Sequence, residues 1–261
     1  MTAAAALPLL ILLIIKGSVI QFGWLVLVLS LLGLHEFYGM ALAGRKTLVG
    51  IASLMGILPP LCLILADSPF ILPIMTLVFI SYALYFLFTF REMKTATMEL
   101  SILCLGFAYV PLLIVHLQML RGLQHGQQWL LLLMLIVMSG DTAAYYVGTA
   151  LGKRKLCPLV SPNKSVEGAA GGLAGSVIGA IIAKYVIFTD LTMGDAVAAA
   201  LFLGTLGQLG DLFESFLKRS FGVKDSGAVF PGHGGVLDRL DSILFAAPAA
   251  YYYAFYIFQG R

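Results

Sequence analysis

The residues best suited to chemistry lie in one polar stretch near the carboxyl end, between Ser215 and Asp241. It reads Ser-Phe-Leu-Lys-Arg at 215–219, Lys-Asp at 224–225, and Pro-Gly-His-Gly-Gly-Val-Leu-Asp-Arg-Leu-Asp at 231–241. Glycines let the backbone approach an anion, basic side chains neutralise phosphate, and carboxylates hold hard cations such as Mg²⁺. This stretch therefore predicts a site for metal and phosphate.

The carboxylates of this stretch have helical spacing. Asp238 and Asp241 are three residues apart, which places both on one face of a helix, and Asp211 is followed at helical spacing by Glu214 and Lys218. We predict that Asp211, Asp238 and Asp241 bind Mg²⁺ and leave positions open for substrate phosphates. Two alternatives remain, a helix-dipole effect for the last pair and a salt-bridge ladder that seals the end of a helix.

A second polar segment lies earlier in the chain. Asp141 stands inside an apolar run, where an ionised carboxylate costs about 2.5–3.5 kcal/mol at mid-membrane, so it needs a partner or a cavity. The segment Ser161-Pro162-Asn163-Lys164 predicts a turn that opens a helix, with Ser161 or Asn163 as its cap and Lys164 reaching a phosphate. The run at 153–155, Lys-Arg-Lys, is interpreted as an anchor at the lipid headgroups.

These polar residues sit in a chain with the composition of a membrane protein. Of its 261 residues 60% are hydrophobic and 11% charged, whereas soluble domains carry about 25% charged residues. Cys62, Cys104 and Cys157 form no CxxC pair, so we interpret them as packing residues rather than as a disulfide or zinc framework. No basic patch interleaved with aromatic residues suggests a nucleic-acid partner.

The predicted fold is all-α, a polytopic integral membrane protein without strands. Spans need about 20 apolar residues, and about nine candidates follow. They are residues 3–15, 18–42, 48–66, 69–90, 98–119, 127–151, 168–187, 195–217 and 238–258. The first lacks a basic n-region, so we expect a membrane helix rather than a signal peptide, but it is short, and a re-entrant segment stays open as an alternative. The seventh is rich in glycine and alanine, which predicts close contact with neighbouring helices.

The basic residues predict the orientation of the chain in the membrane and a functional division between its two halves. Most Lys and Arg fall in the second, fourth, sixth and eighth loops, which the positive-inside rule places in the cytoplasm with the N-terminus, leaving the C-terminus outside. Both polar segments then face the cytoplasm. We expect residues 1–125 to form structural, lipid-facing helices and residues 126–261 to carry the catalytic loops.

The stretch from Ser215 to Asp241 resembles the signature of phosphatidate cytidylyltransferases, also called CDP-diacylglycerol synthases. Every position of that pattern is met. The segments at 141–145, 161–168 and 208–215 also resemble this family, which leaves the first five helices with generic hydropathy only. The chain departs from the family at Val166, where the family often has tryptophan, and at Ala143, where it often has glycine. Neither departure removes a charged group.

The resemblance implies transfer of a cytidylyl group from CTP to phosphatidate, giving CDP-diacylglycerol and pyrophosphate. It implies Mg²⁺, with K⁺ as a plausible second ion, and a homodimer in the inner (cytoplasmic) membrane. The expected catalytic residues, which meet phosphates or position them, are Lys218, Arg219, Lys224, His233 and Arg239. The expected substrate-binding residues are Asp141, Ser161, Asn163, Lys164, Asp225, Gly234 and Gly235.

Other histidines and other functions lead to different expectations. His35, Glu36 and His116 are interpreted as satisfied packing residues. A CDP-alcohol phosphotransferase would carry Asp-Gly-x-x-Ala-Arg with later acids spaced four apart, and no such run occurs. Cytidylyl transfer to an ether lipid stays open. A transporter would place acids near mid-membrane in both halves, but here they cluster toward one end of the chain.

Overall fold

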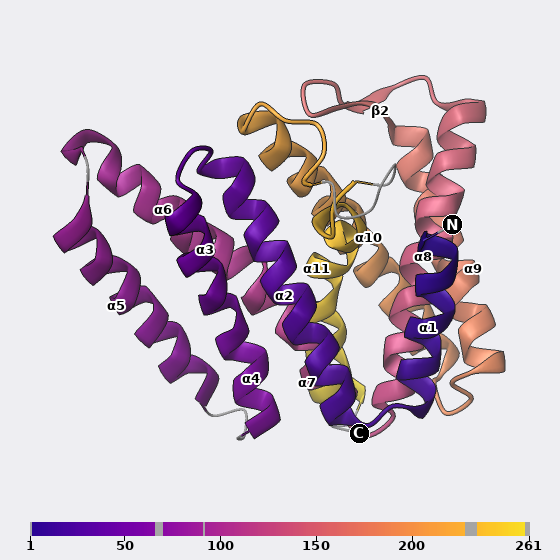
Figure 1. The fold of residues 1–261 in the computed structure, drawn as a ribbon. Helices are drawn as coiled ribbons and strands as arrows, with labels where there is room; N and C mark the ends of the chain where they lie inside the picture. The colour runs from indigo at the N-terminus through magenta and orange to yellow at the C-terminus, as the bar shows by residue number, and fades with distance from the viewer. Residues whose placement is uncertain (1, 66–69, 91, 228–233, 259–261) are drawn as a thin grey trace. The chain divides into compact units, whose positions relative to one another are not determined.

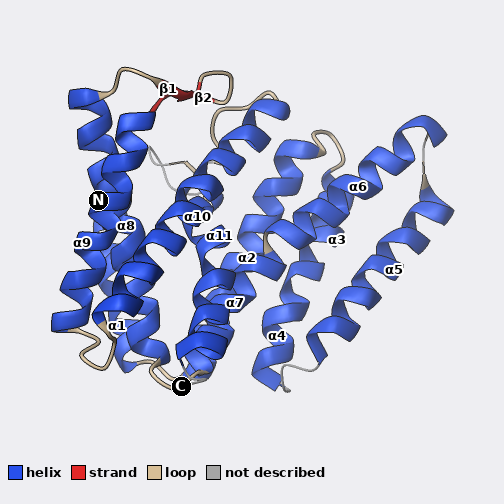
Figure 2. Cartoon of the chain, turned by 180° about the vertical axis from the view of Figure 1, so that it is seen from behind, coloured by secondary structure: helices blue, strands red, loops and turns tan. Residues whose placement is uncertain are grey.

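The computed structural model describes residues 2–65, 70–90, 92–227 and 234–258, which are helical apart from one two-stranded sheet (Figures 1 and 2). This confirms the predicted all-α class and adds one small hairpin that the sequence did not predict. The helices are α1 (Thr2–Lys16), α2 (Val19–Ala41), α3 (Lys46–Leu54), α4 (Leu58–Leu65), α5 (Ile71–Thr89), α6 (Met93–Tyr109), α7 (Pro111–Gly122), α8 (Gly126–Leu151), α9 (Val166–Val186), α10 (Met193–Ser220) and α11 (Leu237–Tyr252).

Proline divides two of the predicted spans. A 3₁₀ turn, η1 (Met55–Ile57), separates α3 from α4, and Pro59 and Pro60 lie in the first turn of α4. Pro111 is the first residue of α7, directly after α6. Proline has no N–H to donate within a helix, but the first turn needs none, so a new helix starts at each of these positions.

Among the described residues, seven helical segments are long and apolar enough to cross a membrane. They are Val19–Ala41, Lys46–Leu65, Ile71–Thr89, Met93–Gly122, Gly126–Leu151, Val166–Val186 and Met193–Ser220. Helix α1 has 15 residues and α11 has 16, the latter continued by a π-helical segment, Tyr253–Phe258. The nine predicted spans each coincide with a helical segment, while the count of nine membrane crossings stays a prediction.

The chain folds into two compact units that alternate along the sequence. Unit 1 comprises Met1–Gly17, Leu120–Lys224 and Arg239–Arg261, and unit 2 comprises Ser18–Met119 and Asp225–Asp238. In unit 2, α2 packs against α3, α4 and α6. The buried Tyr38 of α2 donates its hydroxyl to the carbonyl oxygen of Leu103 at 2.7 Å. The predicted functional division at residue 125 stays a prediction.

Small residues bring the helices of unit 1 together. Helix α9 packs against α8 and α10 (Figure 1), and it carries the glycines that the sequence singled out. A Cβ at Gly175 would lie 2.7 Å from the carbonyl oxygen of Ser139, and one at Gly171 would lie 2.6 Å from the side chain of Val147. The predicted close contact is confirmed, since no larger residue fits these positions without a shift.

A hairpin connects α8 to α9 and corrects one prediction. Strand β1 (Lys155–Cys157) pairs antiparallel with β2 (Ser161–Ser165). The segment Ser161–Lys164 is therefore a strand and not a turn that opens a helix. The turn comes earlier, with Pro158 directly after β1, where proline's fixed φ suits a turn. Ser165 is the cap of α9 and accepts the N–H of Gly168 at 3.1 Å.

Candidate active site

Unit 1 gathers acidic and basic residues from both predicted polar segments. Lys164 of β2 places its Nζ 2.5 Å from the Asp211 Oδ2 of α10. One turn further along α10, Lys218 Nζ lies 2.5 Å from Glu214 Oε2. Glu214 is almost fully buried, at 1% exposure of its side chain. The two segments, separated by about 45 residues of chain, thus meet at one cluster, and the helical face predicted for Asp211, Glu214 and Lys218 is present.

Two further carboxylates belong to this cluster. Asp141 of α8 interacts electrostatically with Asp211 and with Lys164. Asp241 of α11 interacts with Asp211, Glu214 and Asp141. The four carboxylates thus form one interacting cluster, in which Asp211 and Glu214 are each paired with a lysine. Asp141 is exposed and the other three are half-buried or buried, where charges interact more strongly than in water. Such an excess of negative charge favours a divalent cation.

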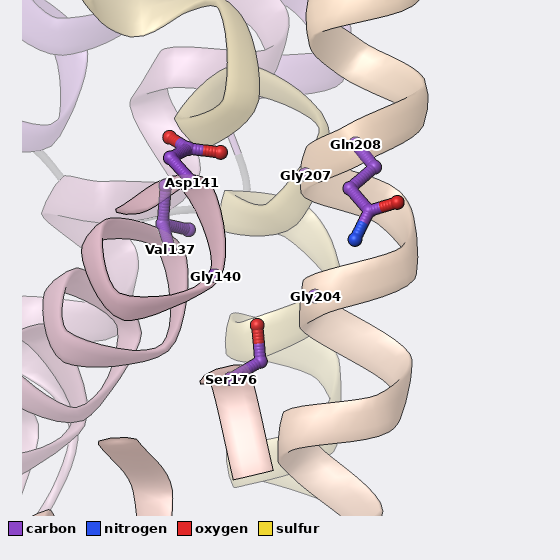
Figure 3. A pocket seen from close by; sticks show the side chains of 7 residues that line it. All are labelled: Val137, Gly140, Asp141, Ser176, Gly204, Gly207 and Gln208. Carbon is purple, nitrogen blue, oxygen red and sulfur yellow. The ribbon is translucent and has the colours of Figure 1, made fainter. Parts of the chain in front are cut away.

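A small cavity lies beside Asp141, between α8, α9 and α10. Its other lining residues are Val137, Gly140, Ser176, Gly204, Gly207 and Gln208. Figure 3 shows Asp141 and Gln208 on different helices, with Ser176 on a third helix below them. Its volume of about 10 Å³ is the order of space that one water molecule needs. Asp141 lines this cavity, is exposed, and interacts with Lys164, while its role in the site stays a prediction. The cavity is too small for a nucleotide.

Glu167, a residue without an assigned role in the sequence, orders the basic run before the hairpin. Its carboxylate accepts the backbone N–H of Lys153 at 3.0 Å and that of Arg154 at 3.1 Å. Glu167 stands in the first turn of α9, next to the cap Ser165. The carboxylate thereby fixes the backbone of the segment that leads into β1, and the basic side chains of this segment are exposed.

The remaining predicted residues of unit 1 are more exposed. Arg219 donates from Nη1 to the carbonyl oxygen of Val223 at 3.2 Å, which closes the end of α10. Lys224, Arg239 and Asn163 are exposed, and Ser161 is half-buried. Exposure leaves the basic side chains of Arg219, Lys224 and Arg239 accessible to an anion from solution.

Asp238 has a well-defined environment in unit 2. Its Oδ2 accepts the backbone N–H of Ser226 at 2.9 Å, the hydroxyl of Ser226 at 2.8 Å and the N–H of Gly235 at 2.8 Å. Gly234 has a φ of 80°, and a Cβ there would lie 2.5 Å from Asp238 Oδ2. Only glycine adopts this conformation at such close approach without strain. Gly234 and Gly235 thus shape the environment of Asp238.

The predicted residues are distributed over both units. Asp211, Asp241, Asp141, Lys164 and Lys218 belong to unit 1. Asp238, Asp225, Gly234 and Gly235 belong to unit 2, where Asp225 is exposed. His233 lies outside the described residues.

Magnesium fits the unit 1 cluster by donor type and charge. Carboxylate oxygens are the protein ligands that Mg²⁺ takes, and four carboxylates face two lysines there. Within the described residues, however, no three His, Cys, Asp or Glu side chains are gathered around one point as metal ligands. Asp211 Oδ2 instead forms an ion pair with Lys164. The charges required by a cation are present, while a converged ligand set is not.

Glu36 on α2, predicted to be a satisfied packing residue, has specific polar partners in the structure. It is 7% exposed and accepts the N–H groups of Val236 and Leu237 at 2.9 Å each. The signal available in the sequence was an acid inside an apolar helix, a position that is costly without partners. Nothing in the sequence alone identifies those partners, because they lie about 200 residues away.

Comparison with known proteins gives one consistent result. A family described as the cytidylyltransferase family matches residues 1–257. The chain is 34% identical over 253 residues to the phosphatidate cytidylyltransferase of Staphylococcus saprophyticus and 32% identical over 250 residues to that of Staphylococcus aureus strain COL, in each case with 95% of both chains covered. It is 43% identical over 155 residues to the enzyme of that name from Bacillus subtilis, covering 59% of this chain and 58% of that protein. This multi-pass membrane protein therefore belongs to the cytidylyltransferase family.

Proposed function

We propose that this protein transfers the cytidylyl group of CTP to phosphatidate, releasing pyrophosphate and forming CDP-diacylglycerol for phospholipid synthesis. The observation that carries the proposal is the unit 1 cluster, in which Asp211 and Lys164 from two separate signature segments lie in contact. Relatives that align over nearly the whole chain bear the name phosphatidate cytidylyltransferase. The family and the site chemistry therefore support the same reaction.

The proposed chemistry is a displacement at phosphorus. An oxygen of the phosphatidate phosphate attacks the α-phosphorus of CTP, and the bond from that phosphorus to the oxygen bridging to the β-phosphate breaks. Pyrophosphate leaves with the bonding electrons. A phosphate monoester is already ionised near neutral pH, so the attacking oxygen requires no strong base. Charge neutralisation and alignment of two anionic substrates are the main demands on the protein.

We assign these demands to the basic residues. Lys164 and Lys218 lie within the acidic cluster and can contact phosphate there, and the exposed Arg219, Lys224 and Arg239 are available to phosphate groups from solution. His233 is proposed to position a phosphate, while Asp225 is proposed to orient Lys224 or the cytidine. These assignments follow the charges of the substrates, since CTP and phosphatidate are both polyanions.

Magnesium is proposed as the cofactor. When bound, it would neutralise developing negative charge on the phosphates and help to align them. Asp211 and Asp241 would hold it, with Asp141 as a further candidate, and the sequence spacing adds Asp238. Potassium as a second ion rests on the family resemblance. A homodimer and a cytoplasmic active site are likewise proposals, the latter supported by the distribution of Lys and Arg.

The deciding experiment measures pyrophosphate release and CDP-diacylglycerol formation by the purified protein in detergent. We expect both products only when CTP, phosphatidate and Mg²⁺ are all present, and none with excess chelator. An ether-linked analogue of phosphatidate tests the acceptor in parallel. A folded protein that forms neither product from either acceptor would refute the proposed reaction, and activity that survives the chelator would refute the metal requirement.

A further inference from the structure

Glu36 connects helix α2 to the signature stretch within unit 2. Its Oε1 accepts the N–H of Val236, and its Oε2 accepts the N–H of Leu237, both at 2.9 Å. The Ser226 hydroxyl lies 3.2 Å from the same Oε2. One buried carboxylate thus contacts the signature stretch at two places, Ser226 and residues 236–237, that lie on either side of residues 228–233.

Ser226 links Glu36 to Asp238. Its hydroxyl lies 2.8 Å from Asp238 Oδ2 and 3.2 Å from Glu36 Oε2, and its backbone N–H donates to Asp238 Oδ2 at 2.9 Å. Because a hydroxyl carries one hydrogen, Ser226 donates to one carboxylate at a time, and the shorter distance favours Asp238. Ser226 is 5% exposed. The two carboxylates therefore share one buried hydroxyl and are oriented together.

Two glycines make room for Glu36. A Cβ at Gly227 would lie 2.7 Å from Glu36 Oε1, and one at Gly235 would be closer still to Glu36 Oε2 and to the Ser226 hydroxyl. Any side chain at either position would displace the carboxylate from its backbone donors. The glycines on both sides of residues 228–233 are thus explained by the approach of Glu36, without reference to substrate.

The carboxylate also suits the start of α11 electrostatically. The first N–H groups of a helix have no partner within the helix, and its N-terminus carries a partial positive charge. Glu36 accepts two such N–H groups while it is itself buried. Hydrogen bonds to a charged acceptor are stronger than those between neutral groups. Removing the charge should therefore loosen the first turn of α11, which includes Asp238.

We propose that Glu36 is a positioning residue for the cytidylyl transfer. It acts through Asp238, whose carboxylate it holds in place by fixing Ser226 and the start of α11. This inference rests on the proposed function for its effect on turnover, whereas the anchoring contact itself can be tested without any substrate.

The test compares Glu36→Gln with Glu99→Gln in the full-length protein in detergent. Glutamine keeps the size of the side chain but replaces one acceptor oxygen with an NH₂ donor that faces backbone N–H groups. Glu99 is a suitable control because it is a paired carboxylate of the same unit, bound to Arg45. The measurements are hydrogen exchange of a peptide spanning residues 234–240, the kcat and KM for both substrates per folded molecule, and the Tm.

In Glu36→Gln we expect the amides of Val236 and Leu237 to exchange about 10-fold faster and kcat to fall at least about 10-fold, with the KM for CTP changed less than about 3-fold. Glu99→Gln should match the parent protein in all three. Ser226→Ala, which removes only the shared hydroxyl, should lower kcat by about 5-fold and serves if Glu36→Gln fails to fold.

The outcomes separate the two proposals. Unchanged exchange at Val236 and Leu237 in Glu36→Gln would refute the anchoring contact, whatever the activity. Faster exchange with normal kcat per folded molecule would refute the positioning role and leave a structural contact. If Glu36→Gln does not fold, normal kcat in Ser226→Ala refutes the positioning role. If the parent protein forms no CDP-diacylglycerol, the proposed function fails, and the exchange data still decide the contact.

Discussion

At the scale of single residues, the acidic cluster determines what the site can do. Asp241 interacts with three other carboxylates, whereas Asp211 and Glu214 each have a lysine within 2.5 Å. A carboxylate in such surroundings is costly unless a cation compensates for it. This surplus of carboxylates is the basis for the proposal that the cluster binds a cation.

If Asp241 binds the proposed magnesium ion, replacing it by asparagine should cut turnover at least about 100-fold, because the variant loses a charged ligand for that ion. The side chain keeps its size, so the protein should stay folded in detergent. The measurement is the rate of pyrophosphate release per folded molecule. Asp190→Asn is the matched control, since that carboxylate of unit 1 is 67% exposed. Near-normal turnover in Asp241→Asn would remove Asp241 from the metal site.

Lys164 gives a second prediction at this scale. Its ammonium contacts Asp211 in the structure and is proposed to neutralise a substrate phosphate. Lys164→Gln should lower kcat/KM about 10- to 100-fold, the range expected for losing a hydrogen bond to a charged group. Lys184→Gln, which removes the charge that lies over the Tyr185 ring, should leave kcat/KM unchanged. Equal kinetics for both variants would show that Lys164 only balances the charge of Asp211.

At the scale of elements, the close packing of α8 and α9 holds the acidic cluster together. Asp141 lies on α8, and Lys164 lies on β2, directly before α9. The predicted basis for this packing was the run of small residues, and the structure places Gly175 against Ser139 and Ala143. A methyl group added at Gly175 has no room, while one added at Gly50 of α3 meets nothing within 4 Å.

Gly175→Ala should therefore destabilise the protein by about 1–3 kcal/mol through overpacking. Gly50→Ala should be neutral or stabilise it by up to about 1 kcal/mol, because alanine has the higher helix propensity. Both changes replace a helical glycine with the same residue, so only the surroundings differ. Unfolding in detergent, followed by circular dichroism, gives the difference. Equal stability of the two variants would contradict the close packing.

Most of the helices, but not the hairpin, could be predicted from the sequence. Helix bounds were predictable to within a few residues for most spans because the apolar length of each segment determines them. The hairpin at 155–165 was missed, since two short strands of mostly polar residues carry no alternating pattern and Pro162 suggested a turn. Pro158 makes the turn instead. The breaks within two spans do have a signal in the sequence, because Pro59 and Pro111 each lie in the first turn of a new helix.

At the scale of the whole molecule, the sequence predicts candidate site residues but not which of them contact one another. Charge and spacing identified Asp211, Asp241 and Lys164, and the structure brings them together in unit 1. Spacing alone could not show that Asp238 is oriented by Ser226, because that contact depends on a loop with no regular period. It could not assign Glu36 to the start of α11 either, since a contact across about 200 residues has no local signal.

The membrane orientation gives the last prediction. Lys153 precedes the hairpin before α9, and Asp190 follows α9, so the two lie on opposite sides of the membrane if α9 spans it. The distribution of Lys and Arg predicts that Lys153 lies on the cytoplasmic side, from which we propose that CTP enters the site. In a background with Cys62, Cys104 and Cys157 replaced by serine, a membrane-impermeant maleimide applied to spheroplasts should label Asp190→Cys. It should label Lys153→Cys only after permeabilisation. The reverse pattern would invert the predicted orientation and place the acidic cluster on the side away from cytoplasmic CTP. Labelling of both variants in intact spheroplasts would mean that α9 does not cross the membrane.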